Sequence, residues 1–237
     1  MSERFRHAIR LGDDALVLGQ RLSEWCGHAP MLEIDLSLAN IALDLIGQAT
    51  HFLGVAGAAE GQGRDADMLA FRRDVLDFRN CLLVEQPNGD FAQTIARQFL
   101  FSNWQELLLQ EICETSDSAL SDIARKAVKE VAYHRRFANE WAIRLGDGTQ
   151  ESRARFEAGL DWMWRFADEL FDARSGTPSL RPAWDERISG VLAEAGLETP
   201  KARRGATGGR DGHHSEHLGH LLCEMQFLQR AYPDARW

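Results

Sequence analysis

Apolar residues recur along much of the chain at alternating spacings of three and four, which is the pattern of one face of an α-helix. One stripe consists of Ile34, Leu38, Ile41, Leu45 and Phe52, and another of Leu120, Ala124, Ala127, Val131, Ala138, Trp141 and Leu145. No segment of weight alternates with the period of a β-strand. The pattern therefore predicts an all-α protein.

The first pair of helices is expected over about residues 12–57. The Gly-Asp-Asp sequence at 12–14 has the residue types of a helix N-cap, and Pro30 suits the first turn of the helix that follows. Apolar residues such as Leu36 and Leu43 extend well around this second helix. We therefore expect it to be central and buried.

A second pair of helices is expected over about residues 90–146, with Asp90 capping the first and Asp117 or Ser118 capping the second. The connection at 58–89 is about thirty residues long and has room for a short helical piece. Two tight hairpins joined by one long crossover are the connectivity of ferritin-like four-helix bundles. We predict that architecture here.

The C-terminal third is expected to add accessory helices to the same domain, which would span 1–237. Helical patterns are present at 149–173, 182–196 and about 213–231. The stretch 198–212 is rich in Gly and Arg, which favours a mobile loop or linker.

Composition narrows the functional class. The 237 residues carry a formal net charge of −9, which argues against nucleic acid or an anionic membrane as partner. The apolar stretches look short and interrupted, so we expect no membrane span, and the N-terminus does not read as a secretion signal. The four cysteines are isolated, which indicates neither zinc nor a disulfide framework and fits a reducing cytoplasm.

Two polar pairs interrupt the apolar stripes. Asp44 precedes Gln48 by four positions, and Glu130 precedes His134 by four. Residues four apart lie on one helix face, so both pairs should point toward a bundle interior. Ferritin-like di-iron proteins place Glu-x-x-His motifs on two helices in that position.

Neither motif is intact here. Gly47 stands three positions after Asp44, and Tyr133 stands three positions after Glu130, where the motif would have histidine. The carboxylates available on the other two helices are Asp14, Glu24, Glu106 and Glu111. Glu130 and His134 could still bind iron, but a buried polar network without metal is the interpretation we favour.

A second group of possible metal ligands lies near the C-terminus. It consists of His213, His214, His217 and His220, with Glu216 and Glu224. Some of these histidines have the one-face spacing that zinc requires, but no other ligand-rich segment is evident. Helix capping, packing and contacts with another subunit are the favoured roles.

The last predicted helix offers residue types that are common at the centres of protein interfaces. These are Met225, Phe227, Leu228, Arg230 and Tyr232. They predict a partner interface, and the alternative is that the helix packs only on its own bundle.

Four stretches together resemble the PaaC-type subunits of the bacterial ring 1,2-phenylacetyl-CoA epoxidase, a ferritin-like multicomponent monooxygenase family. They are LGDDALVLGQRLSEWCGHAPMLEIDLSLANIALDLIGQA (11–49), LLVEQPNGDFAQTIARQFLF (82–101), KEVAYHRRFANEW (129–141) and EHLGHLLCEMQFLQRAYPDARW (216–237). The resemblance covers most of the chain and is weakest over 174–212.

The resemblance implies a non-catalytic companion that carries no cofactor. The di-iron centre would belong to a homologous catalytic subunit, PaaA, and a small subunit, PaaB, and a reductase, PaaE, would complete the system. Two alternatives stay open. The chain could itself be a di-iron oxygenase or a metal-binding ferritin-like protein, or it could be a scaffold unrelated to oxidation.

Overall fold

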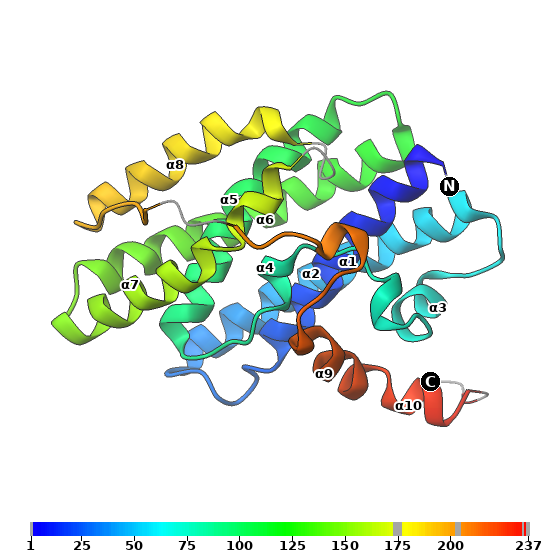
Figure 1. Cartoon of the computed structure of the whole chain (residues 1–237), viewed down its shortest axis with the longest axis horizontal. Helices are drawn as coiled ribbons and strands as arrows, with labels where there is room; N and C mark the ends of the chain where they lie inside the picture. Colours follow the sequence, from blue (N-terminus) through cyan, green and yellow to red (C-terminus); the bar gives the residue numbers. More distant parts are fainter. Residues whose placement is uncertain (1, 173–176, 202–204, 234, 236–237) are drawn as a thin grey trace. The chain divides into compact units, whose positions relative to one another are not determined.

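The computed structural model describes residues 2–172, 177–201, 205–233 and 235, and over these residues it contains helices and turns but no β-strand (Figure 1). The predicted all-α class is confirmed. The chain divides into two compact units, one formed by residues 1–87 with 208–237 and the other by residues 88–207.

The first unit is built on a hairpin of two long helices, α1 (Glu3–Ser23) and α2 (Leu32–Glu60), which pack along one another. Gly61 ends α2 in the left-handed conformation, with a φ of 72° that favours glycine. The remaining elements are short: α3 (Ala66–Phe71), η1 (Val75–Asp77), α4 (Leu82–Glu85), η4 (Gly209–Asp211), α9 (Glu216–Met225) and α10 (Phe227–Ala231).

The start of α1 differs from the prediction. The helix begins at Glu3, and the Ser2 hydroxyl accepts a hydrogen bond from the Phe5 N–H at 3.2 Å. Asp13 and Asp14 therefore lie in the middle of the helix, where both are buried. The predicted cap at 12–14 is wrong because these two carboxylates form long-range ion pairs instead of ending a helix.

The burial of α2 was also predicted incorrectly. Leu32, Leu36 and Leu43 are 70%, 56% and 66% exposed, so one face of this helix lacks a cover within the described part of the chain. By length and composition alone α2 could cross a membrane, a test that core helices of soluble proteins also pass, and half of its most apolar window is buried. The expectation that every apolar stretch is too short does not hold for this helix.

The second unit contains the other predicted hairpin, α5 (Phe91–Cys113) and α6 (Ser118–Gly146). The Asp90 and Asp117 side chains accept hydrogen bonds from the N–H groups of Gln93 and Ala119, which confirms both predicted caps. The unit is completed by α7 (Gln150–Trp164), η2 (Ala167–Phe171), η3 (Pro178–Leu180) and α8 (Arg181–Glu194).

The stretch predicted as a mobile loop is partly an ordered piece of the first unit. Residues 202–204 lie outside the described part of the chain, but Gly209 and Arg210 are buried. A Cβ atom on Gly209 would lie 2.4 Å from the Asn80 carbonyl oxygen, so only glycine allows this close backbone approach. The end of the predicted loop is therefore packed against the crossover.

Candidate functional site

The polar pair of α2 spans one helical turn. Gln48 is buried, whereas Asp44 is only half-buried. A Cβ atom on Gly47 would have no heavy atom within 4 Å, so this position faces open space.

The polar pair of α6 lies in the other unit. His134 is fully buried, with its ring centroid 6.4 Å from that of Tyr133. Glu130 is half-buried and has the Lys126 ammonium at 4.0 Å. The roles of Asp44, Gln48, Glu130 and His134 as a vestigial metal site stay predictions.

The other carboxylates that a four-helix metal site would need are held by arginines. Asp14 accepts hydrogen bonds from Arg210 at 2.9 and 2.7 Å. Glu106 forms ion pairs with Arg135 at 2.8 Å and Arg187 at 2.6 Å. An arginine takes up both the charge and the lone pairs that a metal ligand must offer. These carboxylates do not fit a di-iron centre.

The part of the chain that the structure describes contains no group of three or more His, Cys, Asp or Glu residues that could hold a metal ion. The C-terminal histidines fit this finding. The His214 ring lies between Glu85, at 2.8 Å, and the Phe78 carbonyl, at 3.1 Å, while His213 and His220 are exposed.

Glu85 is the centre of a buried polar cluster that the sequence did not indicate. It is fully buried, and it accepts hydrogen bonds from the Ser215 N–H at 2.6 Å and the Asn80 amide at 2.9 Å. Arg21 of α1 donates to the Glu85 carbonyl at 2.9 Å. The cluster joins α1, α4 and the segment that precedes α9.

Asp13 forms a second buried anchor. Arg73 donates to both of its carboxylate oxygens, and the Arg79 N–H donates to Asp13 at 2.8 Å. The Arg73 guanidinium also stacks 4.2 Å above the centre of the Phe78 ring. Two consecutive acids inside an apolar helix were the signal for these anchors, because a charge is buried only with a partner.

Asp14 is shaped electrostatically by its burial. Removal from water raises the pKa of the Asp14 carboxyl above its ordinary value of 3.8, and the positive charge of Arg210 opposes this rise. The Cys81 N–H also donates to Asp14, at 2.8 Å.

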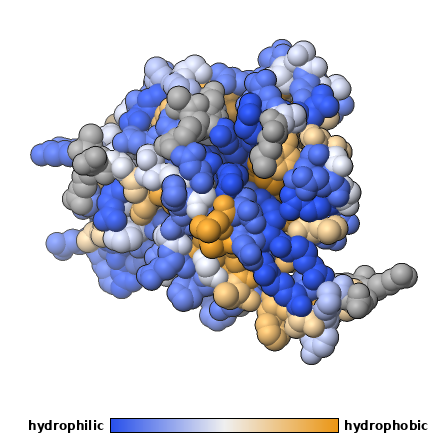
Figure 2. All heavy atoms as spheres, turned by 45° about the vertical axis from the view of Figure 1, so that its right-hand side comes forward, coloured by the Kyte–Doolittle hydropathy of each residue, from blue (hydrophilic) through white to orange (hydrophobic). Residues whose placement is uncertain are grey.

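Two apolar surfaces are exposed. On α2, Leu32, Leu36 and Leu43 share a face by their spacing of four and seven. Near the C-terminus, Phe227 is 63% exposed, and Leu228 and Tyr232 are exposed as well. Figure 2 shows such apolar groups in orange among the mainly hydrophilic side chains of one face.

The residues predicted for a partner interface differ in their surroundings. Met225 is half-buried, and the exposed Arg230 pairs with Asp74 at 2.8 Å. Between them Gln226 is buried, where it donates to the carbonyls of Ala70 and Arg73. Thus α9 is fixed to its own unit, and α10 displays the apolar side chains.

Comparisons with known proteins identify the family. A family model described as "Phenylacetic acid catabolic protein" matches residues 1–237. The C component of the 1,2-phenylacetyl-CoA epoxidase from Escherichia coli (strain K12) is 47% identical over 249 aligned residues, and the alignment covers 100% of both chains. The chain belongs to the ferritin-like phenylacetic acid catabolic protein family.

Proposed function

We propose that this chain is a non-catalytic subunit of a phenylacetyl-CoA epoxidase that acts in aerobic phenylacetate degradation in the cytoplasm. Its task would be to bind a di-iron catalytic subunit and stabilise the helices that hold the iron. The full-length identity to a component of such an epoxidase supports the assignment to this system.

One observation carries the non-catalytic role, namely the pairing of buried carboxylates with arginines. Asp14 is bound by Arg210, and Glu106 lies between Arg135 and Arg187. A metal ion would have to displace these cations, which would leave them buried and without a counter-charge. The arginines thus take over the electrostatic role that metal ions have in a carboxylate bundle.

The exposed apolar faces are the candidates for contact with the catalytic subunit. A subunit without chemistry of its own affects a reaction through contacts, and obligate interfaces commonly bury about 2,000 Å² or more. The outer face of α2 extends along a 29-residue helix, and α10 adds exposed aromatic side chains. PaaA is the partner we propose for these faces, with PaaB and PaaE as the other components of the system.

The test is an iron analysis of the chain alone and of the chain co-expressed with a catalytic subunit. We expect the purified chain to contain no stoichiometric iron and the co-purified complex to contain iron and epoxidase activity. About two irons per chain, retained by the isolated protein through gel filtration, would contradict the proposal. That result would make the chain a di-iron protein in its own right.

A further inference from the structure

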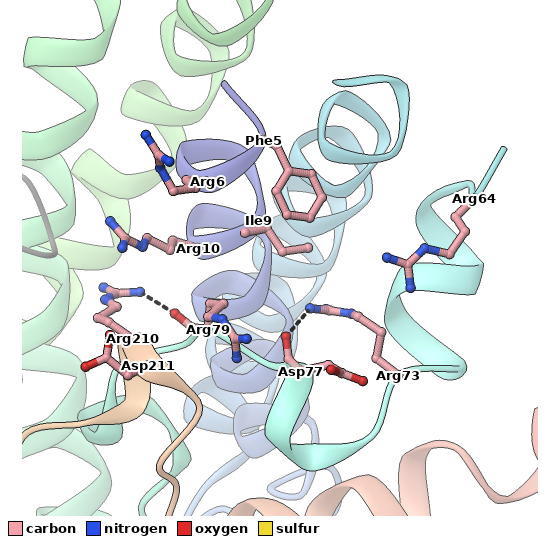
Figure 3. Close-up of a pocket in the computed structure, with 10 residues that line it drawn as sticks. All are labelled: Phe5, Arg6, Ile9, Arg10, Arg64, Arg73, Asp77, Arg79, Arg210 and Asp211. Atoms are coloured by element: carbon pink, nitrogen blue, oxygen red, sulfur yellow. Dashed lines mark hydrogen bonds between the residues drawn. The ribbon is translucent and has the colours of Figure 1, made fainter. Parts of the chain in front are cut away.

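The first unit contains a hollow of about 380 Å³ whose lining is dominated by arginine (Figure 3). This volume is in the range of roughly 300–1,000 Å³ found for small-molecule sites. The lining arginines are Arg6, Arg10, Arg64, Arg73, Arg79 and Arg210. Phe5 and Ile9 add an apolar part to the lining, and Asp77 and Asp211 are its acids.

The local charge is opposite in sign to that of the whole chain. Arg64 pairs with Glu60, Arg73 with Asp13 and Arg210 with Asp14. Counting these three acids together with the two of the lining gives five negative charges against six positive charges. The hollow therefore has a small positive excess in a chain whose net charge is −9. Such a site favours an anion.

The arginines of the hollow are held in place. Buried ion pairs fix Arg73 and Arg210 to α1. One terminal nitrogen of Arg79 donates to the carbonyls of Leu76 and Phe78, at 2.7 and 2.6 Å. Side chains that are already ordered lose less conformational entropy when a ligand binds.

Arg6 and Arg10 supply the most accessible cations. They lie four positions apart on α1, so they share one helix face, and Figure 3 shows both leaving the helix on the same side. Arg6 is exposed and Arg10 is half-buried. The planar guanidinium fork of arginine matches the oxygens of a phosphate group.

We propose that this hollow binds a nucleoside polyphosphate, with its phosphates on Arg6, Arg10 and Arg79 and its base against the apolar lining of Phe5 and Ile9. Two sources share this chemistry: a free nucleotide such as ADP, and the phosphorylated adenosine portion of coenzyme A. The second source connects to the proposed function, but binding as such does not depend on it.

Isothermal titration calorimetry on the full chain tests the proposal, with ADP, coenzyme A and inorganic pyrophosphate as probes. We expect a nucleotide to bind with a Kd on the order of 10–100 μM that weakens with added salt. The variant Arg6→Gln/Arg10→Gln should bind about tenfold more weakly or worse, because two charge-assisted contacts are lost. The matched control is Arg125→Gln/Arg144→Gln, which removes two exposed helix arginines far along the chain and should bind normally.

The outcomes separate the sources. Tighter binding of coenzyme A than of ADP assigns the site to the coenzyme, and equal binding assigns it to free nucleotides. Pyrophosphate binding as tightly as the nucleotides would overturn the assignment to a nucleoside. No binding by the wild-type chain at millimolar concentration, or equal loss in both double variants, would overturn the site altogether.

Two further measurements keep the test decisive. If the double variant does not fold, the single variant Arg6→Gln at an exposed position should still weaken binding, and unchanged affinity would contradict the proposal. Co-purification with a catalytic subunit is measured on the same proteins. A chain that assembles but binds no nucleotide would refute this inference and leave the proposed function intact.

Discussion

Arg210 donates to both carboxylate oxygens of Asp14 at 2.9 and 2.7 Å, across a separation of 196 positions in the chain. Both side chains are buried. The pair joins the middle of α1 to the segment before α9, and it occupies a carboxylate that a metal centre would otherwise use.

Breaking this pair should destabilise the first unit. Arg210→Met leaves the buried Asp14 without its counter-charge, so we expect the free energy of unfolding to fall by about 3–5 kcal/mol. Asp14→Leu combined with Arg210→Met should cost less than the sum of the single changes. Urea unfolding of the four proteins in a double-mutant cycle measures this coupling. Simple additivity would show that the two side chains do not stabilise one another.

The pH dependence of the same pair has a definite sign. Burial raises the pKa of Asp14 above 3.8, so the folded chain holds this proton more tightly than the unfolded chain. The stability that Asp14 contributes is therefore complete below about pH 4 and is lost as the pH rises through the folded-state pKa. The stability difference between wild type and Asp14→Asn should shrink from acid toward neutral pH. A difference that grows with pH would mean that the charge of Arg210 outweighs burial.

The outer face of α2 should matter for assembly and little for folding. Leu36→Ser/Leu43→Ser changes two exposed side chains, so we expect the melting temperature to shift little. Co-purification with the catalytic subunit should be lost, because polar residues at the centre of an interface are costly. Leu76→Ser, at another exposed leucine, is the matched control. Full assembly of the double variant would exclude this face as a docking surface.

The exposed C-terminal helix is tested by a truncation. Removing residues 227–237 takes away Phe227 and Tyr232 but spares Leu221, Leu222 and Gln226, which are buried. We therefore expect a folded chain with weaker binding to the catalytic subunit, measured by gel filtration of the mixed proteins. A truncated chain that binds at full affinity would assign docking to α2 alone.

Local signals in the sequence were sufficient to predict the helices. The caps at Asp90 and Asp117 and the two hairpins depend on neighbouring residues, and all are present in the structure. Burial was harder to predict. An apolar residue such as Leu36 reads the same whether it fills its own core or a partner's, so α2 was expected to be buried on all sides.

The ion pairs could not be read from the sequence for a different reason. Asp13 and Asp14 have the residue types of a cap, and their partners Arg73 and Arg210 are 60 and 196 positions away. Nothing near Arg210 distinguishes it from the other charges of a Gly- and Arg-rich stretch. Only the folded chain shows that it is buried.

The buried histidine of α6 offers the most direct test of the non-catalytic role. His134→Leu removes a fully buried polar group and should cost about 1–3 kcal/mol of stability. Glu130→Gln beside it removes the carboxylate. Complexes are therefore compared only after assembly and iron content are shown to equal those of the wild type, with a ligand variant of the catalytic subunit as the inactive control.

The decisive measurement is the turnover number of an assembled epoxidase complex that carries Glu130→Gln/His134→Leu in this chain. If the chain supports the catalytic subunit without taking part in the chemistry, kcat should stay within about twofold of wild type. A fall of about 100-fold or more, in a complex with normal assembly and full iron, would contradict the account, because a loss of that size is typical of removing a group that acts in the reaction.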